Sequence, residues 1–121
     1  MKSAIIVMME MADQLKIYHW QTKSFAEHKA LGKVYDALVD RTDDFVEVFM
    51  GKYGRMKLDR TDTIEIENYS PEALRQYVDV CVEFLTSLNS QLDAKKDSDL
   101  LNIRDDMLGE LNRLKYLLTL S

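Results

Sequence analysis

The sequence predicts an all-α fold in which a single domain, residues 1–121, forms a four-helix bundle. The chain has 121 residues, enough for one hydrophobic core and too few for two ordinary domains. Only four glycines and one proline are available to interrupt helices. Apolar residues recur at helical spacing in four segments, and no internal repeat or low-complexity tract is visible.

Two long helices are expected first. One should run from about Ser3 to about Thr22, and the next from Phe25 or Ala26 to about Tyr53, where nearby glycines favour a helix stop. The predicted core positions lie on one side of each helix: Ala4, Met8, Met11, Ala12, Leu15 and His19, then Leu31, Val34, Tyr35, Leu38, Thr42, Phe45 and Phe49.

A polar connection from about Arg55 to Tyr69 should follow, and we interpret its strand-like Thr-Ile-Glu-Ile-Glu stretch as loop. Ser70 is a good N-cap for a third helix to about Leu92, and Ser98 could cap a fourth ending near Leu118. Their predicted core positions are Leu74, Tyr77, Val78, Cys81, Leu85 and Leu88, then Leu101, Leu108, Leu111 and Leu114 or Lys115.

The long connection between the second and third helices is long enough to cross the bundle. It therefore favours a ferritin-like four-helix bundle with up-down-down-up topology. A simple up-and-down bundle stays open as the alternative.

Charge and composition exclude several classes of protein. The formal net charge is −5 and there is no basic tail, which disfavours nucleic-acid binding. The single cysteine, Cys81, and an N-terminus without a signal-peptide core indicate a cytoplasmic setting, that of the host cell if the protein is viral. No stretch is apolar enough for a membrane span.

The candidate metal ligands are His19, His28, Asp43 and Glu47, because histidine and carboxylate together suit iron, zinc or manganese. A helical wheel places Asp43 and Glu47 opposite the core stripe, as it does Asp36 and Asp40. Since no Glu-x-x-His motif is present, a complete di-iron site inside one bundle is not expected.

A second apolar stripe on the first helix indicates a subunit interface. Ile6, Met9, Ile17 and Trp20 form this stripe, and Val39, Val46 and Met50 continue it on the second helix. We therefore expect a homo-oligomer, at least a dimer, that forms through the first two helices.

Simpler interpretations of these residues stay open. Asp43 and Glu47 can be a solvated acidic face, His19 a histidine satisfied by a hydrogen bond, and Trp20 an interface anchor. An acidic cluster of Asp36, Asp40 and Asp44 could hold Mg²⁺ for phosphate chemistry, although no phosphate-binding loop accompanies it.

The first two helices resemble those of the Dps-like branch of the ferritin superfamily, particularly its short phage and viral members. The matching positions are His19-Trp20, Phe25, His28, Tyr35, Asp43 and Glu47, and the interval from His28 to Asp43 equals that of the family. The likeness covers roughly residues 18–55, and the Leu-rich end, residues 112–120, is similar to the closing helix of the family.

This resemblance implies a ferroxidase site between two subunits, with His28, and His19 beside it, facing the Asp43 and Glu47 of a second chain. The implied activity is oxidation of Fe²⁺ by peroxide or oxygen, followed by storage in a shell. His19 and His28 are three residues closer together than in the family, so a tighter turn is expected between the helices. A basic N-terminal extension is missing, so the resemblance does not imply DNA binding.

Two functions therefore stay open from the sequence. One is a Dps-like iron-binding protein with ferroxidase activity, whose cofactor or substrate is iron. The other is a catalytically silent ferritin-like protein of viral origin with a structural or interaction role.

Overall fold

The computed structural model describes residues 1–120 and confirms the all-α class. Its elements are α1 (Lys2–Gln21), α2 (Phe25–Tyr53), α3 (Pro71–Ser87), a 3₁₀ turn η1 (Leu88–Ser90) and α4 (Ser98–Leu117). No strand forms within these residues. None of the helices is both long and apolar enough to cross a membrane.

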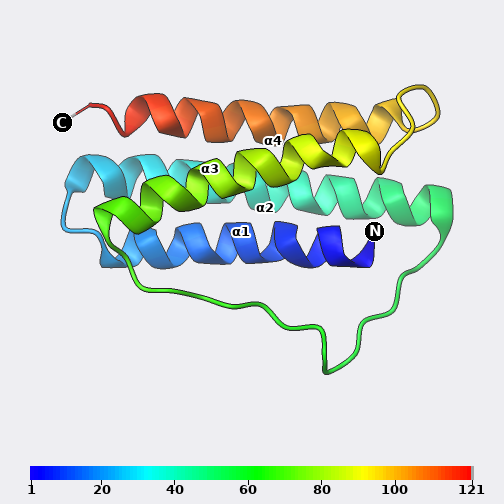
Figure 1. The fold of residues 1–121 in the computed structure, drawn as a ribbon, viewed down its shortest axis with the longest axis horizontal. Coiled ribbons are helices and arrows are strands. Elements are labelled where there is room, and N and C mark those ends of the chain that lie inside the picture. Colours follow the sequence, from blue (N-terminus) through cyan, green and yellow to red (C-terminus); the bar gives the residue numbers. More distant parts are fainter. Residues whose placement is uncertain (121) are drawn as a thin grey trace.

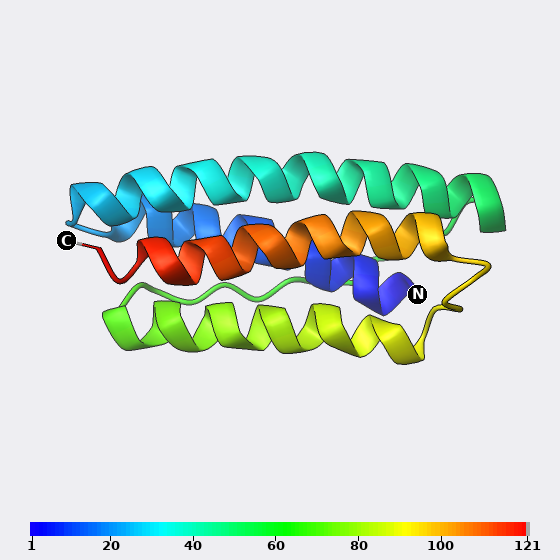
Figure 2. The same cartoon turned by 90° about the horizontal axis from the view of Figure 1, so that it is seen from above.

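The long connection between α2 and α3 determines the topology. It carries the chain from one end of the bundle back to the other, so α2 and α3 run in the same direction and α1 and α4 run in the opposite one (Figure 1). A view at right angles places α2 and α3 at opposite corners of the bundle (Figure 2). A simple up-and-down bundle would need α2 and α3 to be antiparallel, so the observed topology is up-down-down-up.

The core matches most of the prediction for the first three helices and differs from it in the first half of α4. Of the expected core residues, His19, Tyr35, Phe49 and Tyr77 are only partly buried, and the prediction did not include the buried Ile5 and Tyr18. Leu31, Leu38, Leu74 and Leu85 are fully buried, as expected. In α4 the expected core residues Leu101 and Leu108 are only partly buried. The buried face in this first half of α4 lies one residue earlier, at Leu100, Arg104 and Met107, whereas Leu111 and Leu114 are buried as predicted.

Arg104 explains both this shift and the end of α3. Its guanidinium is buried and donates to the Leu85 carbonyl at 2.7 Å and to Asn89 Oδ1 at 2.7 Å. It thereby satisfies acceptors at the end of α3, where the chain tightens into η1. The α-helix therefore stops at Ser87, earlier than the expected Leu92.

Asp97, and not Ser98, precedes the first residue of α4, and its carboxylate does not cap the helix. Instead it accepts hydrogen bonds from the Tyr53 hydroxyl and, at 2.9 Å, from the Asp93 N–H. These two bonds hold the pKa of Asp97 below its ordinary value. Asp97 thus joins the end of α2 to the loop before α4.

The connection itself is fixed to α1 by side chains. Gln14 is buried, its amide donates to the Glu67 carbonyl at 2.9 Å, and it accepts from the Glu67 N–H. Alternate N–H groups of the connection donate to α1 in this way: Glu65 to Glu10 at 2.9 Å, Glu67 to Gln14 at 2.7 Å and Tyr69 to Gln21 at 2.6 Å. Because every second N–H group faces α1, the connection has the alternating sequence of a strand although it is not part of a sheet.

Replacing Gln14 should weaken this attachment. In Gln14→Leu the N–H and C=O of Glu67 lose their partner, which should lower the free energy of unfolding by about 1–3 kcal/mol. Urea denaturation of Gln14→Leu, compared with Gln21→Leu at an exposed position, measures this effect. If the two variants lose equal stability, the buried amide is not the main attachment.

Asp97 should make stability depend on acid pH. Because its pKa is lowered on folding, Asp97 stabilises the fold above its unfolded pKa, about 3.9, and loses this contribution as pH falls through the lower folded value. The difference in the free energy of unfolding between the natural chain and Asp97→Asn should be largest at neutral pH and should decrease in acid. Urea midpoints measured across this range check it, and a constant difference would contradict it.

Candidate metal centre

His19 and His28 lie face to face where α1 turns into α2. Their ring centroids are 3.8 Å apart and the ring planes differ by 14°. The turn between the helices is short, since α1 ends at Gln21 and Ser24 caps α2 by accepting from the Glu27 N–H at 3.2 Å. The shorter spacing of the two histidines therefore brings them together.

The backbone determines which ring nitrogens carry protons. Nδ1 of His19 lies 2.6 Å from the carbonyl oxygen of His28, and Nδ1 of His28 lies 2.8 Å from that of His19. A carbonyl can only accept, so each Nδ1 must be the donor. In the neutral ring each Nε2 then keeps a free lone pair, as in metal-binding histidines whose other nitrogen donates to a carbonyl.

Gly32 makes room for the His19 ring on the surface of α2. A Cβ atom at this position would lie 2.8 Å from Cε1 and 3.1 Å from Nδ1 of His19. Gly32 was not among the residues predicted for the site. A glycine in the middle of a long helix, where it costs about 1 kcal/mol relative to alanine, is the signal that could have identified it.

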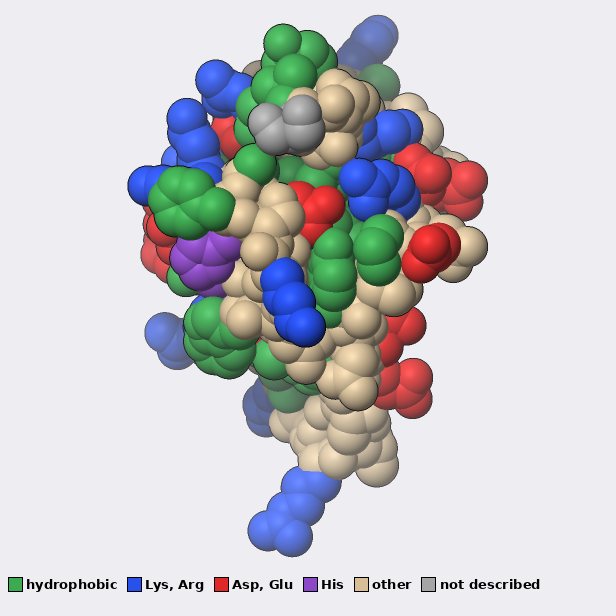
Figure 3. Space-filling view, turned by 90° about the vertical axis from the view of Figure 1, so that its left-hand side faces the viewer, with side chains coloured by type: hydrophobic (Ala, Val, Ile, Leu, Met, Phe, Trp, Pro, Cys, Tyr) green, Lys and Arg blue, Asp and Glu red, His purple; other side chains and the backbone are tan. Residues whose placement is uncertain are grey.

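Aromatic and lysine side chains surround the histidine pair. Phe25 is 71% exposed and its ring lies 6.4 Å from that of His28. Trp20 is 63% exposed, with the Lys16 ammonium 5.6 Å from its ring centre. In Figure 3 the histidine surface lies among hydrophobic side chains, with Lys and Arg side chains nearby. The histidine pair therefore reaches the outside of the molecule at one end of the bundle.

Asp43 and Glu47 lie elsewhere. Both are exposed on α2, as the helical wheel predicted, and Asp43 is about 22 Å along the helix from His28. Within residues 1–120, no three His, Cys, Asp or Glu side chains gather closely enough to hold a metal ion. One chain thus brings the two histidines together but leaves the two carboxylates apart from them.

Asp43 borders a groove between α1 and α2 with a volume of about 150 Å³. Met8, Ala12 and Val39 are among its lining residues, and Met9 and Val39 are 44% and 43% exposed. Of the apolar stripe expected on the outer side of these helices, Met9, Trp20 and Val39 are therefore exposed, whereas Ile6, Ile17, Val46 and Met50 are partly buried.

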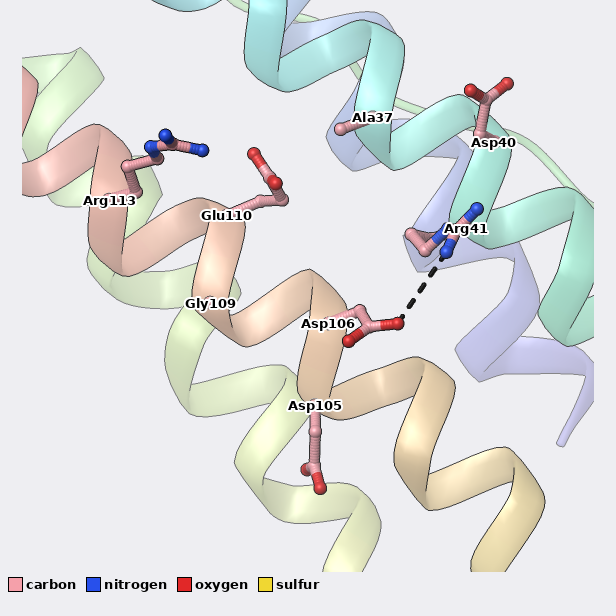
Figure 4. Close-up of a pocket in the computed structure, with 8 residues that line it drawn as sticks. All are labelled: Ala37, Asp40, Arg41, Asp105, Asp106, Gly109, Glu110 and Arg113. Carbon is pink, nitrogen blue, oxygen red and sulfur yellow. Dashed lines mark ion pairs between the residues drawn. The ribbon is translucent and has the colours of Figure 1, made fainter.

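A second groove, of about 570 Å³, lies between α2 and α4. Figure 4 shows Asp40, Asp106 and Glu110 around it together with Arg41 and Arg113. Arg41 lies 3.6 Å from Asp106 and, outside the groove, 3.0 Å from Asp44. Because Arg41 already neutralises Asp106 in the groove and Asp44 beside it, the groove is a poor site for Mg²⁺.

Cys81 takes no part in the candidate centre. It is buried in the core, and burial raises the pKa of its thiol to about 12. It therefore stays protonated and unreactive near neutral pH, and its burial agrees with its predicted core position.

Comparison with known proteins gives two matches. Residues 19–118 match a family described as a family of unknown function, DUF5856. A relative, the "Uncharacterized 14.6 kDa protein in mobD-ri intergenic region" of Enterobacteria phage T4, is 29% identical over 102 residues, which are 84% of this chain and 74% of the relative. No solved structure matches the chain.

Gly32→Ala should displace the His19 ring. NMR of the ring nitrogens should show Nδ1–H tautomers for both histidines in the natural chain and lose this pattern for His19 in the variant. Gly51→Ala and Gly109→Ala are matched controls, because a Cβ at either position meets no atom within 4 Å. An unchanged His19 spectrum in Gly32→Ala would contradict the close packing.

Proposed function

The chain belongs to the DUF5856 family, a family of unknown function. From the chemistry of its site we propose that the protein binds Fe²⁺ and oxidises it with peroxide or oxygen. The site would be shared between two chains. His28 and His19 would come from one chain, and Asp43 and Glu47 from the other.

The observation that carries this proposal is the state of the two histidines. Each Nδ1–H is used by a backbone carbonyl, so in the neutral form of each ring the lone pair lies on Nε2, and the two rings meet at one solvent-accessible place. Imidazole nitrogen suits Fe²⁺, and carboxylate oxygen suits the harder Fe³⁺ that forms on oxidation. A mixed set of this kind favours binding of the reduced ion and stabilises the oxidised one.

The position of the carboxylates supports a site between chains. Asp43 and Glu47 point away from their own core and lie far from their own histidines, so they can complete the ligand set only for another molecule. The exposed Met9, Val39 and Trp20 on the same side supply apolar area for that contact.

The fold is compatible with this assignment. The up-down-down-up order of the helices and the long crossover agree with a ferritin-like bundle, and the residues from His19 to Glu47 agree with its Dps-like branch. In this site the carboxylates and imidazoles hold the iron while its electrons reduce peroxide or oxygen. Positions left free by the protein ligands admit the oxidant.

A second candidate is a ferritin-like phage protein that has no metal activity and a structural or interaction role. The phage T4 relative supports a phage setting, in which the protein would act in the cytoplasm of the host. In this alternative the stacked histidines serve only to fasten α1 to α2.

Anaerobic titration with Fe²⁺ followed by peroxide or oxygen separates the two functions. The natural chain should bind iron and develop Fe³⁺ absorbance, and His28→Ala and Asp43→Ala should each lower the oxidation rate by at least about tenfold. Glu83→Ala, which removes an exposed carboxylate from α3, should leave the rate unchanged. If the natural chain binds no iron, the silent role replaces the ferroxidase.

Mixing the two inactive variants tests whether the site is shared. A pair made of one His28→Ala chain and one Asp43→Ala chain has one site with all its ligands and one site that lacks both His28 and Asp43. Random pairing at equal amounts should therefore restore about a quarter of the natural activity. A mixture as inactive as its components would place the ligands within one chain.

A further inference from the structure

We propose that one end of the bundle docks onto an anionic lipid surface. This end, which faces the viewer in Figure 3, contains the last two turns of α1 and α4 and the first two turns of α2 and α3 (Figure 1). Because no helix of residues 1–120 is long and apolar enough to span a bilayer, the contact is peripheral. It depends neither on iron nor on the pairing of chains, and so goes beyond the proposed function.

The most exposed apolar side chains gather at this end. Among residues 1–120, five large hydrophobic side chains are more than half exposed, and four of them lie here: Trp20 at 63%, Phe25 at 71%, Tyr116 at 63% and Leu120 at 51%. The fifth, Val80, lies in the middle of α3. Since Trp20 is already proposed for the contact between chains, the anchors in the lipid are Phe25, Tyr116 and Leu120.

This end is also basic, although the chain as a whole is acidic. Residues 14–33, 67–78 and 111–120 form it, and they hold seven Lys or Arg and three Asp or Glu. Its formal charge is therefore +4, whereas the whole chain has −5 and the remainder has −9. A molecule with this division of charge turns its basic end toward a negative surface.

Two of the three carboxylates at this end are held by side chains of the protein itself. Glu27 accepts from the Tyr69 hydroxyl at 2.5 Å, and Arg75 lies 3.7 Å from its other oxygen. Glu67 accepts from the Tyr18 hydroxyl at 2.5 Å. These carboxylates therefore do little to neutralise the lysines around them.

The lysines at the start of α2 are free to meet a partner. Within the described residues, Lys23, Lys29 and Lys33 form no ion pair, and all three are exposed. The Lys29 ammonium lies 5.5 Å from the centre of the Phe25 ring. Figure 3 shows the same mixture across this end, with Lys and Arg between hydrophobic side chains. Cations beside apolar side chains match a lipid surface in which phosphate groups lie above hydrocarbon.

Other acidic partners fit this end less well. A nucleic acid would bind the lysines but has no place for the aliphatic Leu120, and Lys29 already covers a face of the Phe25 ring that a base would need for stacking. An acidic protein would need pockets matched to Phe25 and Tyr116. A fluid lipid interface accepts apolar side chains in any arrangement.

Flotation with vesicles tests the role of charge. The natural chain should float with vesicles that contain phosphatidylglycerol and should not float with phosphatidylcholine alone. Lys29→Glu should raise the Kd for the anionic vesicles by at least about fivefold, because each basic residue near such a surface contributes about that factor. Lys57→Glu makes the same charge change on the exposed connection and should leave the Kd within about twofold.

The apolar anchors have their own test. Phe25→Ser should raise the Kd on the order of tenfold, whereas Val80→Ser, an equally exposed control on α3, should not change it. An environment-sensitive dye on Tyr116→Cys should shift its emission to shorter wavelength with anionic vesicles, and the same dye on Val80→Cys should not. Cys81 is buried and stays unlabelled. Circular dichroism confirms folding of each variant.

Each outcome decides the inference. No flotation, equal flotation with both kinds of vesicle, or equal loss in Phe25→Ser and Val80→Ser would overturn it. Release from the vesicles by an oligonucleotide at the same phosphate concentration would assign this end to a nucleic acid instead. A chain that floats as expected but binds no iron would uphold the lipid contact and reject the ferroxidase. Iron oxidation by a chain that does not float would do the opposite.

Discussion

The amide of Gln14 joins the crossover to the bundle, and the arrangement of all four helices depends on that attachment. A chain that leaves α2 at one end must return along the whole bundle before it can begin α3 in the same direction. The returning segment has no helix of its own, so its backbone groups need partners from elsewhere. Gln14 supplies a donor and an acceptor to Glu67, and Tyr18 adds a hydroxyl that donates to the Glu67 carboxylate at 2.5 Å.

This attachment leaves the opposite side of α1 free. The connection lies along α1 on one side, and α2 covers another, so the face that carries Met9 and Trp20 has no partner within the chain. The buried polar contacts and the exposed apolar residues are thus two consequences of one arrangement. A crossover on the other side of α1 would have hidden the surface that the proposed dimer uses.

Much of the fold could be predicted from the sequence because local signals were strong. Helical spacing and few breakers gave α1 and α2 almost to the residue, and Ser70 with Pro71 gave the start of α3. The phase of the first half of α4 could not be predicted, because its buried face includes Arg104, whose guanidinium is satisfied by Asp105 and by carbonyl and amide oxygens from α3 and η1. Tertiary contacts of this kind leave no local pattern.

Only part of the candidate site could be predicted from the sequence. The exposed side of α2 that holds Asp43 and Glu47 followed from helical phase alone. The stacking of His19 on His28 did not, because it depends on the path of a short turn and on hydrogen bonds from each ring to the other helix. Spacing predicted these residues as ligands, whereas only the packed turn shows which ring nitrogen of each histidine is the donor.

The close contact between Gly32 and His19 has a consequence for the family as a whole. The space above this glycine is taken by an imidazole ring, so any larger side chain at the equivalent position in a relative would have to expel the ring. The identity of that one residue would therefore tell whether a relative has room for the histidine pair. A relative with glycine and histidine at these two positions could form it, and a relative with a larger residue in place of the glycine could not.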